Sequence, residues 1–222
     1  MDSPVQSFSE GRAAWVEDLD RVAQQNHWGV ALLAVGWVHL ACFLTCEWMH
    51  AVGNRHNWQY VALWGVELAT VIAVVRLIAG QGWVRSTPLA GIIARVWGTV
   101  LILSFNLASL NTLSGLDHEW FKPVLCTLAA FGFMMMAYLI STWFFAAAVQ
   151  MYFTGLLMVN YLQFSYLIHG VSWWTALMVI GGTMELRRRR SLRRPEPIAI
   201  RVSLPAAPSR GRRLQFRTDR SS

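Results

Sequence analysis

Four side chains that can bind a metal ion share one face of a predicted helix. They are spaced three, four and four residues apart, at His39, Cys42, Cys46 and His50. At 100° per residue they fall within a narrow arc. Histidine and cysteine bind zinc, and histidine also binds haem iron. His39 and His50 lie eleven residues apart, roughly 16 Å along a helix axis, so they cannot share one ion. A packing stripe explains the same spacing, because buried cysteine behaves as a small hydrophobic residue.

A carboxylate in the middle of an apolar run also needs an explanation. Glu67 lies about eight residues from the end of its run, where an unpaired charge is costly. His39, in the preceding run, is expected at comparable depth. We therefore predict a contact between Glu67 and His39. The alternative is a protonated Glu67 that donates to a backbone carbonyl.

Three amide side chains lie in the later apolar runs. Asn106 is expected deep in a helix, where an amide hydrogen-bonds across helices. Asn160 and Gln163 follow in a later run, and we predict that they meet Asn106. Together with His39 and Glu67, these amides are the candidate polar residues within the membrane.

A second set of metal-capable side chains is expected at one membrane surface. His50, His118 and His169 fall near the predicted outer ends of three apolar runs, and acidic residues flank His118. Such a set can bind a divalent metal ion, and ordinary solvated loop residues would have the same composition. We therefore expect no cofactor, with haem or a divalent metal as the alternative.

Several catalytic motifs are missing from the sequence. It contains no Walker phosphate-binding loop and no Gly-x-Ser-x-Gly elbow. Its only lysine, Lys122, is expected at a membrane edge, which disfavours a buried Schiff-base lysine. An enzyme is therefore the less favoured class of protein, and no catalytic residues are assigned.

The elements that must position all these residues are transmembrane helices. Of the 222 residues, 55% are hydrophobic and 14% are charged, against roughly 25% charged in soluble domains. Apolar runs at 28–48, 60–78 and 92–113 each approach the roughly 20 residues that a membrane-spanning helix needs.

The stretch 123–186 is harder to divide, because it contains no charged residue before Glu185. Gly170 can end one helix and Ser172 can begin the next, and a softer break is predicted at 150–155. Three spans would then cover 124–146, 150–168 and 172–186. We expect an all-α, polytopic transmembrane helix bundle of about six spans, or five if the last two merge.

Charge sets the expected orientation. The segment 187–222 holds twelve arginines against two acidic residues, a formal +10, whereas the remainder has a formal −3. Arginines beside a membrane stay on the cytoplasmic side and bind anionic lipid headgroups. We assign headgroup contact to Arg187, Arg188, Arg189, Arg190, Arg193 and Arg194. Six spans then place both termini in the cytoplasm, as expected for a multi-pass protein of the cell (inner) membrane.

The chain is expected to have three parts. Residues 1–27 form a cytoplasmic segment with a short amphipathic helix that begins at a Ser7–Glu10 capping box. Residues 28–186 form the bundle. Residues 187–222 form a basic tail that is predicted to be disordered, although alternating apolar residues at 198–204 would also suit pairing with a partner's sheet edge.

Two classes of function follow. The first is a transporter-like or accessory membrane subunit, and the second is a membrane-embedded metal- or haem-binding protein that uses histidines of the first span and the outer loops. The expected partners are the lipid bilayer, other membrane proteins or a second copy of the chain. Nucleic acid is not expected, because the basic tail has no aromatic platform.

Overall fold

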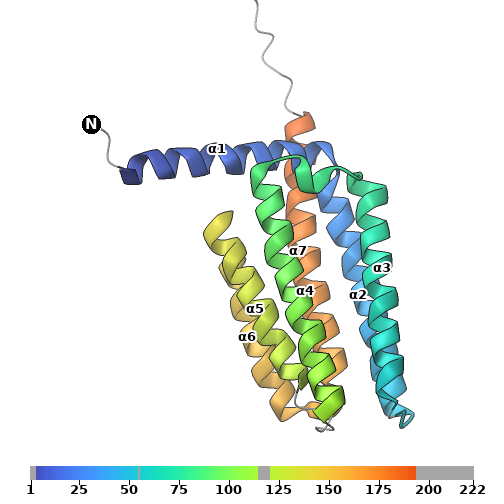
Figure 1. The fold of residues 1–222 in the computed structure, drawn as a ribbon. Coiled ribbons are helices and arrows are strands. Elements are labelled where there is room, and N and C mark those ends of the chain that lie inside the picture. The colour runs from blue at the N-terminus through green and yellow to red at the C-terminus, as the bar shows by residue number, and fades with distance from the viewer. Residues whose placement is uncertain (1–3, 55, 115–120, 194–222) are drawn as a thin grey trace, which may run out of the picture.

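The structure, a computed structural model, describes residues 4–54, 56–114 and 121–193. Six of its helices run alongside one another as a bundle (Figure 1). They are α2 (Trp28–Ala51), α3 (Asn57–Ala79), α4 (Pro88–Ser114), α5 (Phe121–Leu139), α6 (Phe144–Asn160) and α7 (Ser165–Arg193). The remaining helix, α1 (Pro4–Gln25), lies across one end of the bundle, which we name the α1 end. The opposite end is the far end.

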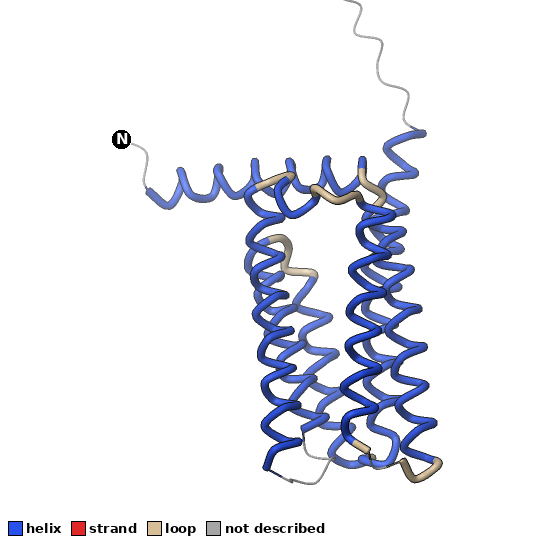
Figure 2. Tube along the Cα trace, turned by 45° about the vertical axis from the view of Figure 1, so that its right-hand side comes forward, coloured by secondary structure: helices blue, strands red, loops and turns tan. Residues whose placement is uncertain are grey.

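The chain crosses the bundle six times, and the predicted all-helical membrane bundle is confirmed. Five helices are long and apolar enough to span a membrane, whereas α6 is shorter at 17 residues. Figure 2 shows helix in nearly all of the described chain, with short loops at both ends of the bundle. α6 and α7 are separate helices, so the last two predicted spans do not merge into one, although five helices meet the length and composition of a membrane span.

The predicted breaks within 123–186 are also wrong. The helices end at Leu139 and Asn160, and α7 runs through Gly170 and Ser172 without interruption. Ser172 hydrogen-bonds to a neighbouring helix instead of capping its own. The Gln150 amide nitrogen donates to the Ser172 carbonyl (2.9 Å), and the hydroxyl oxygens of Thr154 and Ser172 lie 2.6 Å apart. Polar side chains in apolar surroundings often link helices in this way.

Glycines bring α2 and α7 into close contact. Gly29 and Gly36 of α2 face α7, whereas Gly170 and Gly181 of α7 face α2; we name these four residues the glycine seam. A Cβ atom on Gly170 would lie 2.6 Å from the Phe43 Cβ, and one on Gly181 would lie 2.8 Å from the Gly29 carbonyl oxygen. Small residues let membrane helices approach closely, so that their backbones and side chains gain dispersion contacts. Gly170 is therefore a packing residue.

The far end of α7 is capped by a residue from α2. The first N–H groups of a helix have no partner within the helix, and a negative charge there is favourable. The Glu47 carboxylate accepts a hydrogen bond from the Leu167 backbone N–H (3.0 Å). This contact gives a carboxylate of α2 a structural role in the bundle.

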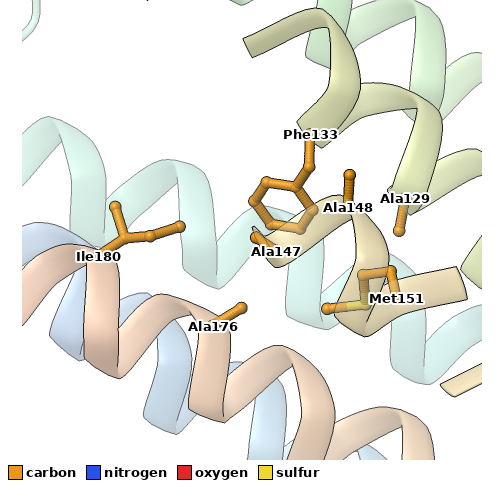
Figure 3. Close-up of a cluster of buried hydrophobic side chains, with 7 residues drawn as sticks. All are labelled: Ala129, Phe133, Ala147, Ala148, Met151, Ala176 and Ile180. Carbon is orange, nitrogen blue, oxygen red and sulfur yellow. The ribbon is translucent and has the colours of Figure 1, made fainter. Parts of the chain in front are cut away.

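A second packed cluster joins α5, α6 and α7 (Figure 3). Four of its seven residues are alanines, which let the three helices approach one another. Phe133, Met151 and Ile180 fill the space between them. The cluster consists of Ala129, Phe133, Ala147, Ala148, Met151, Ala176 and Ile180.

The segment before the bundle is helical, as predicted, but it begins earlier. α1 starts at Pro4, so Ser7 lies inside the helix and the predicted capping box is wrong. Proline suits the first turn because its missing N–H has no partner there in any case. α1 contacts α2, α4 and α7, and the Ser191 hydroxyl donates to the side-chain amide oxygen Oε1 of Gln24 (3.2 Å).

The basic segment is partly helical, since α7 continues to Arg193. The buried Glu185 carboxylate accepts hydrogen bonds from Arg188 and Arg189, each 2.9 Å from the guanidinium Nε. The predicted tail therefore begins with seven helical residues. Arg194 and the predicted strand or disorder beyond it lie outside the described residues.

Candidate functional site

A cavity of about 1450 Å³ lies between α3 and α4. α3 packs chiefly against α2, and although Tyr60 and Ala79 near its ends are buried, no residue of α3 between them is. Leu68 and Val71 of α3 face it from one side, and Trp97 and Leu101 of α4 from the other. Val16 and further residues of α1 line the cavity, and α1 lies across this end of the bundle (Figure 1).

A His–Glu pair lines the cavity and joins α2 to α3. The His39 Nδ1 lies 2.5 Å from the Glu67 Oε1, and the two side chains are 16% and 12% exposed. The contact predicted from the sequence is therefore confirmed. This contact between two partly buried side chains links α2 to α3.

Aromatic rings surround His39. Its ring centroid lies 4.5 Å from that of Phe43, 5.3 Å from that of Trp173 and 5.9 Å from that of His169. The His39 Nε2 is buried, and no described residue hydrogen-bonds to it. Leaving such a nitrogen without a partner costs roughly 1–3 kcal/mol. The His–Glu pair thus has one unused hydrogen-bonding position.

The cavity changes character towards the α1 end. Apart from His39 and Glu67, the middle of the cavity is apolar and aromatic. The α1 end of the cavity is lined by Glu17 and Asp20 of α1 together with Arg76 and Arg187. An occupant would therefore meet charged groups near the membrane surface and apolar ones deeper in. That arrangement suits an amphipathic molecule.

The three predicted amides do not meet. Asn106 is exposed on α4, and Gln163 is exposed in the short 3₁₀ helix η2 (Leu162–Phe164). The Asn160 side chain donates to the Leu156 carbonyl of its own helix (3.0 Å). The prediction is wrong because Asn106 lies on the opposite face of α4 from the buried amide, which is Asn111.

The predicted metal set at the outer surface is not assembled either. His169 lies one turn inside α7 at the far end of the bundle, near its predicted place, but it is buried between helices and not in a solvated loop. His50 is half-buried in the last turn of α2, and His118 lies outside the described residues. Within the described part of the chain, no three His, Cys, Asp or Glu residues form a metal site.

The histidine and cysteine side chains that share one face of α2 have two different roles. Cys42 and Cys46 are buried free thiols that pack with Tyr60 and Tyr166, as the packing alternative predicts. His39, one turn earlier, lines the cavity instead. The sequence could not separate these roles, because both positions have the same helical spacing.

Lys122 is buried, although the sequence placed it at a membrane edge. It is 1% exposed, and its ammonium group lies 4.2 Å from the centroid of the Tyr166 ring. A cation over an aromatic face is stabilised by the quadrupole of the ring. Its expected place at an end of the bundle agrees with the start of α5 at Phe121, but its burial was not expected, because an apolar run of sequence does not show which neighbouring helix covers its ends.

Comparisons with protein-family models, with curated proteins and with solved structures find no significant match to this chain. The site is therefore interpreted from its own geometry and chemistry.

Proposed function

We propose that this protein binds and moves a lipid-soluble molecule that has a neutral polar head. The occupant would lie in the cavity between α3 and α4, with its apolar part against Trp97 and Leu101 and its head at the His39–Glu67 pair. Of the two roles expected from the sequence, this supports the transporter-like bundle over the accessory subunit.

The cavity volume is the main support for this proposal. Protein interiors pack as densely as organic crystals, and their voids are few and small. Ligand pockets usually measure about 300–1,000 Å³, and the present cavity, at about 1450 Å³, exceeds them. Its position between two helices of the bundle, with apolar walls, favours entry from the bilayer.

The chemistry of the His–Glu pair supports a neutral head. Glu67 already provides a negative charge when it is ionised, so a carboxylate or phosphate beside it would be repelled. A hydroxyl or carbonyl group can hydrogen-bond to imidazole without adding charge. Such a contact would satisfy the buried His39 Nε2 and would couple binding to proton position.

In the proposed orientation, the α1 end of the bundle lies on the cytoplasmic side of the cell (inner) membrane. Arg76, Arg85, Arg95 and the arginines from Arg187 to Arg193 all belong to that end of the bundle. The bias of basic residues towards the cytoplasm supports this assignment. The exposed members of the Arg187–Arg193 group would contact anionic headgroups.

A photoreactive probe tests the proposal. The full chain in lipid nanodiscs is irradiated with a long-chain alcohol that bears a diazirine, and the labelled residues are mapped by mass spectrometry. Labelling is expected at cavity residues of α3 and α4. Gly98→Leu, which adds a side chain inside the cavity, should reduce it by roughly tenfold, as loss of about 1.4 kcal/mol of binding would.

The matched control is Gly65→Leu. Neither Gly65 nor Gly98 has an atom within 4 Å of a Cβ position, but only Gly98 lines the cavity. Labelling should therefore stay unchanged in Gly65→Leu. Equal labelling in both variants, or labelling spread over the outer faces of the bundle, would contradict the proposal.

A further inference from the structure

Three soft metal ligands meet at the far end of the bundle, each from a different helix. The Cys126 Sγ of α5 lies 3.3 Å from the Met158 Sδ of α6 and 3.1 Å from the His169 Nδ1 of α7. The exposed fractions of these residues are 0%, 1% and 4%. They lie between the helices, and the His169 ring centroid is 5.9 Å from that of His39, so the cluster lies beside the cavity.

We propose that Cys126, Met158 and His169 form a binding site for a cuprous ion. His169 also lines the cavity, but the proposed metal site does not rest on the molecule proposed to occupy that cavity. It is also unlike the metal set expected from the sequence, because two of its three ligands are sulfur atoms that were not expected to bind a metal.

Local packing holds the three ligands together. A Cβ atom on Gly155 would lie 3.2 Å from the Cys126 Cβ, so glycine at this position lets α6 approach α5 beside Cys126. Met158 follows Gly155 by three residues and so lies close to the same helix face. On the other side of α7, Gly170 packs against Phe43 of α2 and positions the turn that holds His169.

The ligand types select the metal. Thiolate and thioether ligands favour Cu(I), whereas thioethers are uncommon ligands of zinc. Carboxylate or water oxygens, which suit magnesium and calcium, do not occur among the three ligands. Imidazole binds copper as well as zinc, so His169 is compatible with the preference of the two sulfur ligands for Cu(I).

The two separations from the Cys126 sulfur are close to those that a shared metal ion requires. Metal bonds of about 2.0 Å to nitrogen and about 2.3 Å to sulfur place trigonal ligands roughly 3.5–4 Å apart. The present separations are 3.1 and 3.3 Å, so the ligands would separate by several tenths of an ångström. A flexible methionine side chain can provide that movement.

Charge balance favours a monovalent ion. On binding, the Cys126 thiol loses its proton to solvent and the thiolate forms a bond to Cu(I), so the Cu–S unit is neutral. The imidazole and the thioether add no charge. A divalent ion at the same three ligands would leave a net positive charge among buried residues, which is costly.

The test is an anaerobic Cu(I) titration of the full chain in detergent, with bicinchoninate as the competing chelator. One Cu(I) per chain is expected, and X-ray absorption should detect two sulfur ligands and one nitrogen ligand. Cys126→Ser, Met158→Leu and His169→Gln should each weaken binding by about 10- to 100-fold, the range found even for residues that act only through a ligand.

Two controls separate this site from the rest of the chain. Met151→Leu changes a buried methionine of the same helix and should leave Cu(I) affinity unchanged. Cys42→Ser/Cys46→Ser removes the other two thiols and should also have no effect. Far-ultraviolet circular dichroism and a single elution peak establish folding, and Met158→Leu, which nearly conserves volume, keeps the test valid if Cys126→Ser unfolds.

Several results would overturn the proposal. One is the absence of Cu(I) binding in competition with bicinchoninate. Another is Cu(I) that persists in Cys126→Ser but disappears in Cys42→Ser/Cys46→Ser. Zinc bound with equal affinity at the same three residues would overturn the assignment to a soft monovalent metal.

Discussion

Two faces of α2 meet their neighbours in opposite ways. On one face, the glycine seam brings α7 so close that a single added methyl group would overlap the partner backbone. On the other, α3 stands beside a cavity of about 1450 Å³ and is joined to α2 in part by the His39–Glu67 contact. The first face is built for close packing, whereas the second leaves space and places a polar pair beside it.

This difference indicates where stability and function lie in the bundle. In a membrane, helix association depends on close packing and interhelical hydrogen bonds, since lipid is as apolar as the helices. The α2–α7 pair therefore acts as the rigid scaffold. The α3 helix has fewer such contacts, so we expect it to be the element that moves when the proposed ligand enters.

The largest expected effect comes from changing the seam. Gly181→Ala should lower the free energy of unfolding by about 1–3 kcal/mol, because its Cβ would lie 2.8 Å from the Gly29 carbonyl oxygen and the backbone must shift. Gly182→Ala, the neighbouring position with open space, should be neutral or slightly stabilising. Unfolding in mixed detergent measures both, and equal losses would contradict the role of the seam.

A smaller effect is expected at the link between the two regions. In a double-mutant cycle, His39→Ala and Glu67→Ala should show a coupling of about 1–2 kcal/mol, within the range for residues in direct contact. The pair is the contact of 2.5 Å that joins α2 to α3. The same unfolding assay measures the free energy of unfolding of the unchanged chain, the two single variants and the double variant. Strictly additive losses would show that the contact adds no stability.

The smallest effect, of opposite sign, is expected at the cavity. Gly98→Ala should raise the free energy of unfolding by about 0.5–1 kcal/mol, because alanine favours the helix and its methyl group meets no atom within 4 Å. Thermal unfolding in detergent compares this variant with the unchanged chain. A loss of stability would show that α4 packs more tightly at this position than the cavity implies.

The His39–Glu67 contact could be predicted because a carboxylate deep in an apolar run needs a partner and few partners exist at that depth. The glycine seam could not, since its glycines are spaced seven residues apart in α2 and eleven in α7, whereas the usual dimer motif has a spacing of four. His39 and Cys42 share one helix face by their spacing, so the sequence could not show that Cys42 is packed whereas His39 lines the cavity.

The helix breaks after Pro123 were missed for a related reason. The turn between α5 and α6 contains no glycine or proline, whereas Gly170 and Ser172, which resemble turn residues, lie inside α7. Turn propensities describe chain segments in water, where loops are exposed. In this bundle, contacts between helices override them. The cavity and the Cys126 cluster depend on three-dimensional packing and have no counterpart in local sequence.

The short α6 has a consequence for the surrounding bilayer. Its 17 residues rise about 25 Å, roughly 5 Å less than the hydrocarbon thickness of an average membrane. Exposed Ser141 and Thr142 at its start must reach water or lipid headgroups. If α6 crosses the bilayer, we expect the lipids beside this turn to compress, so that thinner membranes are the more favourable environment for the protein.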